Sequence, residues 1–423
     1  MRPMNAQCPH PSTRTRPAGE PRRALLLLAA ATAIGSLGLA AGGTAAALLA
    51  VAMTGSDAAA GLPLGALAAG QSAAALLVAR WTSRAGRGAG LILGYAIGMV
   101  GALVVIVAAM RGAFLVMLGG SLFLGGANAA IFLARYAAAD IGGPSARGRA
   151  LGTVLFATAI GTIAGPALLV PTGRLAQALG FPQLAGLYLV ALVAFAGAAL
   201  AIAGLSRSGL PDLGRGSRFA TPDQNRHHAV TRGELATALR RAPARAALLV
   251  LGSTNLVMVA IMAVAPVLLM AHGHGLGFIG LAVSVHVLGM FAPSPVTGWL
   301  ADRVGSAAIA SAAAVLLILA GIGGVVVDHA NGSAMVAVLI VLGLGWNCGV
   351  VGGSALLAAS VPAEVRPRSE GIGEASMGLA AAAGAPAAGI LVALGGFATL
   401  CLAGAAVGAL ILTGTRRPDP TAA

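Results

Sequence analysis

The stretch Gly298-Trp-Leu-Ala-Asp302-Arg303-Val-Gly305-Ser306 connects two long apolar runs of this chain. It places an acid, an arginine and two glycines in a connection that is too short to form a domain. Charged side chains are costly inside hydrocarbon, so this pair marks a tight turn at a membrane surface. We therefore interpret the stretch as the turn between two membrane-spanning helices.

Composition supports a membrane protein. The 423 residues are 58% hydrophobic and only 9% charged, with a mean hydropathy of +0.91, whereas soluble domains have about 25% charged residues. Cys8, Cys348 and Cys401 lack the spacing of metal ligands, so we expect no metal site. Phosphate-binding and zinc-protease motifs are also missing from the sequence. We therefore expect no cofactor, no nucleotide-driven pumping and no enzyme activity.

Twelve apolar runs are long enough to cross a bilayer of about 30 Å as α-helices. The first is too long for the apolar core of a signal peptide, which needs only about 7–15 residues, so it is interpreted as an uncleaved span. The predicted spans are residues 24–53, 58–79, 89–110, 113–137, 150–171, 182–205, 246–271, 276–300, 305–327, 333–358, 371–393 and 396–414.

The basic residues predict the orientation of these spans. With the N-terminus placed inside, only Arg111 and Arg174 of the 26 basic residues fall in outer connections. This asymmetry follows the positive-inside rule and predicts a multi-pass protein of the inner or plasma membrane with both termini cytoplasmic. It also explains the net charge of +14, so we expect the lipid bilayer and no nucleic acid as a partner.

A polar insert between spans six and seven divides the chain in two. Its last part, from Thr231 to Ala242, is typical of a short amphipathic helix on a membrane surface. The first residues of the chain are polar and predict a disordered cytoplasmic tail. The predicted order is tail, six-helix half, cytoplasmic linker, six-helix half and cytoplasmic tail, at residues 1–23, 24–205, 206–245, 246–414 and 415–423.

The two halves carry an internal repeat. The pattern R-x-R-x-x-G opens span five at Arg147 and span eleven at Arg366, so the copies are 219 residues apart (147 to 366). A single offset shared by separate segments indicates two related halves in parallel orientation. The same offset relates Arg84 to Arg303, Gly86 to Gly305, and Gly165 to Gly384.

The spacing G-x-L-A-D-R-x-G at residues 298–305 resembles the signature loop of the major facilitator superfamily, a large family of secondary transporters. The twelve spans, the central insert and the repeat agree with this resemblance. It implies an all-α membrane fold of twelve transmembrane helices in two pseudo-symmetric six-helix halves, which transport by alternating access.

The resemblance implies gating roles for both loops. In the second half these concern Gly298, Asp302, Arg303 and Gly305. In the first half the matching residues are Arg84, Gly86 and Arg87, whereas Ser83 replaces the acid and Ala79 the leading glycine.

The family's architecture places Asp302 at the start of span five, near Arg147 and Arg149. There a carboxylate accepts hydrogen bonds from a helix N-terminus or pairs with arginine. The alternative is a plain turn that carries positive-inside charge.

Span five contains Gly161-Thr-Ile-Ala-Gly165-Pro166, which resembles the G-x-x-x-G-P motif of the superfamily's antiporters. Paired glycines allow close contact between helices, and the proline removes a backbone hydrogen bond and bends its helix. The resemblance implies a hinge or a seal of an antiporter; plain helix packing is the alternative.

Ionisable residues within the spans are candidate functional groups. His286 and Glu374 are the candidates for proton coupling; a histidine bonded to a neighbouring helix and an acid paired with an inner arginine are the alternatives. The middle of span four lacks an arginine and has Ser121 there, so coupling through an arginine is not expected. Arg135 and Asp140, at its inner edge, form either a latch or two interfacial charges.

Neutral polar residues in mid-span are candidates for the wall of a central cavity: Asn128, Asn255, Trp346 and Asn347. Hydrogen bonds between helices are the alternative.

Together, these features predict proton-coupled export of small lipophilic or drug-like molecules by a monomer. Uptake or facilitated diffusion of a neutral metabolite is the second interpretation. A receptor or assembly factor that does not transport is the third.

Overall fold

The computed structural model describes residues 20–39, 41, 45–56, 59, 61–207 and 230–416, and within these residues the chain is helical. Long apolar segments form helices because every backbone polar group then finds a partner inside its own segment. The helices are α1 (Glu20–Ser36), α2 (Ala46–Thr54), α3 (Leu62–Ala85), α4 (Arg87–Arg111), α5 (Phe114–Ala167), α6 (Leu169–Ala178), the 3₁₀ turn η3 (Gln183–Ala185), α7 (Gly186–Arg207), α8 (Arg232–Arg240), α9 (Ala242–Ala271), α10 (Leu276–Phe291), α11 (Ser294–Val304), α12 (Ser306–Val326), α13 (Gly332–Ser360) and α14 (Arg366–Arg416).

Twelve spans follow from these helices. Nine helical segments of the described residues are long and apolar enough to cross a membrane. Two of them, in α5 and α14, each join two spans, because their backbones leave the helical region at Gly143 and Ala146 and at Gly395 and Gly396. The broken first segment, α1 and α2, supplies the remaining span. The predicted all-α fold of twelve helices is thereby confirmed.

Several predicted boundaries differ from the structure. α1 begins at Glu20 rather than after residue 23, α9 begins at Ala242 inside the predicted linker, and α14 begins at Arg366 rather than at 371. Helices continue beyond the hydrocarbon, where arginine side chains reach toward the headgroups, so an apolar run underestimates the length of its helix. The first span, predicted as continuous, is divided between α1 and α2.

The linker is helical where the sequence predicts it. α8 begins with a capping box, in which Thr231 and Glu234 each satisfy a backbone N–H of the other. Residues 1–19 of the predicted N-terminal tail, 208–229 of the predicted linker and 417–423 of the predicted C-terminal tail lie outside the described residues.

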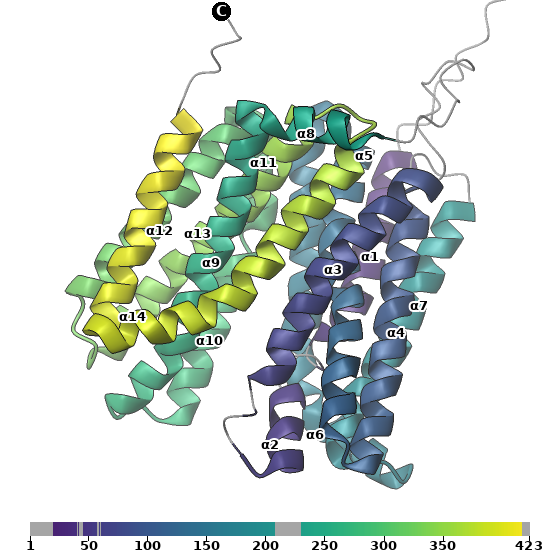
Figure 1. The fold of residues 1–423 in the computed structure, drawn as a ribbon, viewed down its shortest axis with the longest axis vertical. Coiled ribbons are helices and arrows are strands. Elements are labelled where there is room, and N and C mark those ends of the chain that lie inside the picture. The colour runs from purple at the N-terminus through teal and green to yellow at the C-terminus, as the bar shows by residue number, and fades with distance from the viewer. Residues whose placement is uncertain are drawn as a thin grey trace, which may run out of the picture.

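The two halves meet at one end of the molecule. One core of buried apolar side chains lies in the first half and also includes Ala355 and Ala358 of α13. A second core lies in the second half, and a third joins Leu155 of α5 to Met290 of α10 and Trp346 of α13. Figure 1 shows the ribbons of the halves approaching each other near α8 and diverging toward α2 and α10. We call the end that carries α8, Arg87, Asp302 and Arg366 the arginine-rich end.

The repeat is visible in the backbone. Gly86 ends α3 and Gly305 ends α11, and both have a φ of 93°. With ψ at 167° and 145°, this conformation is accessible to glycine and hardly to any other residue. The glycines at these corresponding positions therefore make the same turn in both halves.

We predict that Gly305→Ala lowers the free energy of unfolding by about 1–3 kcal/mol, because alanine is strained at this φ and ψ. The measurement is thermal unfolding of the purified protein in detergent. Gly280→Ala is the matched control, since Gly280 lies in α10 with open space around its Cβ position. Equal unfolding temperatures for the two variants would contradict the prediction.

Candidate functional site

Asp302 holds the two halves together at the arginine-rich end. Its carboxylate accepts hydrogen bonds from the backbone N–H of Gly148 at 2.6 Å and of Arg149 at 3.0 Å. These donors lie at the start of the second helical part of α5, where the helix dipole also favours a negative charge. The Nε atom of the half-exposed Arg149 lies 3.4 Å from the same carboxylate. We call this contact of Asp302 with Gly148 and Arg149 the second-half lock.

Two glycines allow the lock to form. A Cβ on Gly148 would collide with the carbonyl oxygen of Gly298, and a Cβ on Gly298 would collide with that of Gly148. The backbones of α5 and α11 therefore touch directly here. This contact explains why the loop motif has glycine at its first position.

The other charged residues of the loops lie apart from the second-half lock. The guanidinium of Arg303 stacks over the Trp299 ring of its own helix, 4.3 Å from the ring centre. Arg84 is exposed, and Arg147 is half-buried. Of the arginines in the two loop motifs, Arg87 is the one that the structure places in a buried contact between the halves.

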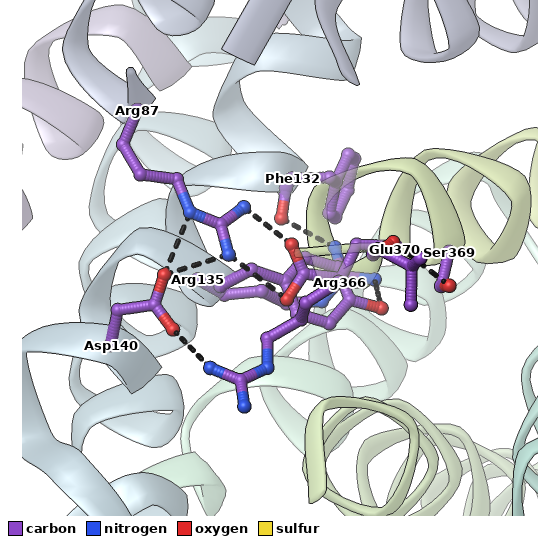
Figure 2. Close-up of polar contacts among 9 residues, drawn as sticks. Arg87, Phe132, Arg135, Asp140, Arg366, Ser369 and Glu370 are labelled. Atoms are coloured by element: carbon purple, nitrogen blue, oxygen red, sulfur yellow. Dashed lines mark hydrogen bonds and ion pairs between the residues drawn. The ribbon is translucent and has the colours of Figure 1, made fainter. Parts of the chain in front are cut away.

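Arg87 belongs to a network of four charged residues, shown in Figure 2. Its guanidinium donates to both carboxylate oxygens of Glu370 in α14, and the side chain of Glu370 is fully buried. It also donates from Nε to Asp140 of α5 at 2.8 Å, and Arg366 of α14 donates to the other oxygen of Asp140 at 3.2 Å. We call Arg87, Asp140, Arg366 and Glu370 the ion-pair network. It contains two acids and two arginines, two from each half.

Arg135 lies deeper between the halves, in a fully buried ion pair. Its Nη2 atom is 2.8 Å from a carboxylate oxygen of Glu374, and both side chains are 0% exposed. Arg135 and Asp140 therefore form neither a latch with each other nor two unpaired interfacial charges, since Asp140 pairs with Arg87 and Arg366. Arg135 lies at the inner edge of span four and not in its middle, yet it is fully buried. In the apolar profile Arg135 resembles an interfacial residue, but the opposite half buries it.

Further polar groups surround the Arg135–Glu374 pair. Gln71 of α3 donates to Glu374 at 2.9 Å, and Arg135 donates to the Phe132 carbonyl at 2.5 Å and to the Ser354 hydroxyl at 2.9 Å. Arg135 and Ser354 are 219 residues apart, the offset of the repeat. Corresponding residues that touch lie beside the symmetry axis, so the pair occupies the centre of the interface between the halves.

Most of the candidate cavity residues are hydrogen-bonded to neighbouring helices. The indole N–H of Trp346 donates to Asn255 at 2.9 Å, and Asn255 donates to the Met377 carbonyl at 2.7 Å. Asn347 donates to the Met290 carbonyl and to the Ser294 hydroxyl, each at 2.7 Å. Asn128, which corresponds to Asn347 by the repeat, is half-buried. These contacts favour interhelical hydrogen bonding for Asn255, Trp346 and Asn347 in this conformation.

His286 is 1% exposed, and its Nδ1 atom lies 2.8 Å from the Leu339 carbonyl of α13. A carbonyl can only accept, so Nδ1 carries the proton of this hydrogen bond. The arrangement matches the alternative of a histidine bonded to a neighbouring helix.

The G-x-x-x-G-P motif lies where α5 ends. A Cβ on Gly161 would collide with Ser36 and Leu37 beside α1, so the two helices pack closely there. Gly165 and Pro166 occupy the last turn of α5, which ends at Ala167 before α6 begins at Leu169. The motif thus combines a close helix contact with a break in the span.

Sequence reasoning missed Glu370, Arg366 and Ser354 as members of the site. A local signal did exist for the first two, because Arg366, Glu370 and Glu374 recur every fourth residue and share one face of α14. Ser354 carried no such signal, apart from its repeat offset from Arg135.

The fold and the inter-half contacts define a transporter of two related six-helix halves. A family model described as Major Facilitator Superfamily matches residues 25–346 and 247–423. The chain therefore belongs to the Major Facilitator Superfamily. Its relatives in this family are transporters of small molecules across membranes, and proteins of this kind are generally not enzymes.

Similar proteins cover nearly the whole chain. The uncharacterized MFS-type transporters YdeG and YddS of Bacillus subtilis (strain 168) are 35% and 32% identical to it over 396 and 393 residues, which is 92% of this chain and 90% and 89% of theirs. The riboflavin transporter RfnT of Brucella anthropi is 38% identical over 115 residues, 26% of this chain and 27% of its own.

Solved structures share the fold at low identity. The human organic anion transporter MFSD10 has a TM-score of 0.73 at 16% identity, with 95% of this chain and 100% of that chain covered. The E. coli fucose:proton symporter FucP has a TM-score of 0.71 at 16% identity, with 94% and 98% covered.

We predict that Glu374→Gln lowers the free energy of unfolding by about 3–5 kcal/mol, because it leaves the charge of Arg135 buried without an ionised partner. Denaturant unfolding of the purified protein measures the loss. The double variant Arg135→Gln with Glu374→Gln removes both charges and should recover most of that stability. If Glu374→Gln is as stable as the unsubstituted protein, the buried pair does not contribute as described.

Proposed function

We propose that this protein is a proton-coupled exporter of small lipophilic or drug-like molecules in the inner, or plasma, membrane of a prokaryote. It works by alternating access as a monomer, since one chain supplies both halves of the pathway. The arginine asymmetry supports an orientation with the arginine-rich end and both termini in the cytoplasm. In this orientation the structure is the conformer closed toward the inside.

The buried pair of Arg135 and Glu374 carries the proposal of proton coupling. The two residues lie on different halves, so opening the inner end separates them. A buried carboxylate without its partner costs several kcal/mol in a low-dielectric interior. Protonation of Glu374 removes its charge and makes separation less costly, so the protonated form favours the conformer open to the inside. Release of the proton inside then favours closure.

This sequence of states supports exchange. A proton that reaches Glu374 in the present conformer enters the cell when the inner end opens. A substrate that binds after the proton leaves is carried outward when the inner end closes again. Glu374 therefore carries the coupling in this proposal, and His286 does not.

The end of α5 immediately after Pro166 supports the export direction. α5 packs closely on α1 at Gly161 and ends at Ala167, an arrangement that suits a hinge and agrees with the antiporter-type motif.

Uptake of a neutral metabolite is the second candidate function. The local match to a riboflavin transporter favours it. The same buried pair would serve proton symport if substrate and proton bound together from the outside.

We predict that inside-out vesicles with an acidic interior release protons when lipophilic cations or neutral drugs are added, and that Glu374→Gln abolishes this release. A pH-sensitive dye follows the interior pH. Glu364→Gln is the matched control, because Glu364 is an exposed acid at the same end and should leave the signal unchanged.

Two other results would overturn export by exchange. Saturable uptake of a labelled neutral compound without proton release would indicate a facilitator. Proton movement in the same direction as a labelled flavin or sugar would indicate symport.

A further inference from the structure

The second-half lock needs two chemical groups. One is the carboxylate of Asp302 in the loop, and the other is a pair of backbone N–H donors, at Gly148 and Arg149, in the opposite half. Removing either group removes hydrogen bonds that join α11 to α5.

The first half lacks the acceptor and one of the two donors of the corresponding lock. The repeat offset of 219 residues places Ser83 where the second half has Asp302. It places Pro367 where the other lock has Gly148, the nearer donor. Ser83 donates its hydroxyl to the Arg80 carbonyl at 2.8 Å, and proline has no N–H. The acceptor and its nearer donor are therefore missing together.

The ion-pair network occupies the place of this missing lock. It joins α4 and α5 of the first half to α14 of the second half, at the same end of the molecule. Three of its four members have uncharged counterparts at the same offset, so the network exists on one side of the molecule only. Ser306, Ala359 and Leu151 stand where a second network would need Arg87, Asp140 and Glu370.

We propose that the ion-pair network replaces the lost lock of the first half, and that Glu370 is its positioning residue. Glu370 supplies from α14 the negative charge that Ser83 no longer supplies from the loop. Its side chain is 0% exposed and bound to Arg87 through two hydrogen bonds. The protein therefore closes its arginine-rich end with two different devices: a carboxylate on a helix N-terminus, and a cluster of ion pairs.

This inference rests on alternating access as proposed above, but it concerns residues other than Glu374. Its test reads the conformation directly, without substrate and without a pH gradient. Failure of proton coupling and failure of the replaced lock are therefore observed separately.

The experiment measures the separation of the halves by double electron–electron resonance. Spin labels are attached to Arg207→Cys and Ala363→Cys, which are exposed positions on different halves near the arginine-rich end. Cys8, Cys348 and Cys401 are replaced in the background. We expect Glu370→Gln to raise the population with long distances between the labels about tenfold. A change of this size is typical when a coupling between two conformations is lost.

The decisive variant restores the missing lock. Adding Ser83→Asp and Pro367→Gly to Glu370→Gln supplies both the acceptor and the donor, and should return the distances to those of the unsubstituted protein. Ser83→Asp with Glu370→Gln is the matched control; it lacks the restored N–H and should recover less.

A second pair of changes keeps the test informative if Glu370→Gln does not fold. Arg87→Gln with Glu370→Gln leaves no unpaired charge from that pair, and should still increase the long distances. Unchanged distances in this double variant would overturn the proposal. So would a restored lock that folds but leaves the distances of Glu370→Gln unchanged.

Discussion

A charge that is buried between two moving halves must have a partner, and this requirement shapes the protein. Arg135 and Glu374 satisfy it at the centre of the interface, and Arg87 and Glu370 satisfy it nearer the arginine-rich end. Each pair joins the two halves, so the contacts that neutralise the charges are also the contacts that close the molecule. Stability of this conformer and the barrier to leaving it therefore depend on the same residues.

The charges can meet only because the backbones come close together. Gly148 and Gly298 bring α5 against α11, and Gly371 brings α14 against Ala75 and Ala79 of α3. Side chains at these positions would hold the halves apart and leave the ion pairs stretched. Small residues and buried charges thus act together, the first by allowing contact and the second by making it specific.

Local patterns predicted the spans, the repeat and the contact of Asp302 with span five, because each depends on residues near one another in sequence or on a family motif. The Arg87–Glu370 pair joins residues 283 positions apart, and no local pattern reports such a distance. Arg135 was placed at an interface because hydropathy records where the hydrocarbon ends and not which half covers a side chain. The four-residue spacing of Arg366, Glu370 and Glu374 on α14 was a local pattern that could have predicted part of the site.

The contact between Arg135 and Ser354 has a consequence for how the two halves diverged. A residue beside the symmetry axis faces its own copy, so an arginine conserved in both copies would place two positive charges against each other. An arginine can therefore be buried in one copy only if the other copy is uncharged at this position. The hydroxyl of Ser354, which accepts from Arg135, is a neutral solution to that conflict. A protein built from two such halves is therefore asymmetric at its centre, with a single buried ion pair beside the axis.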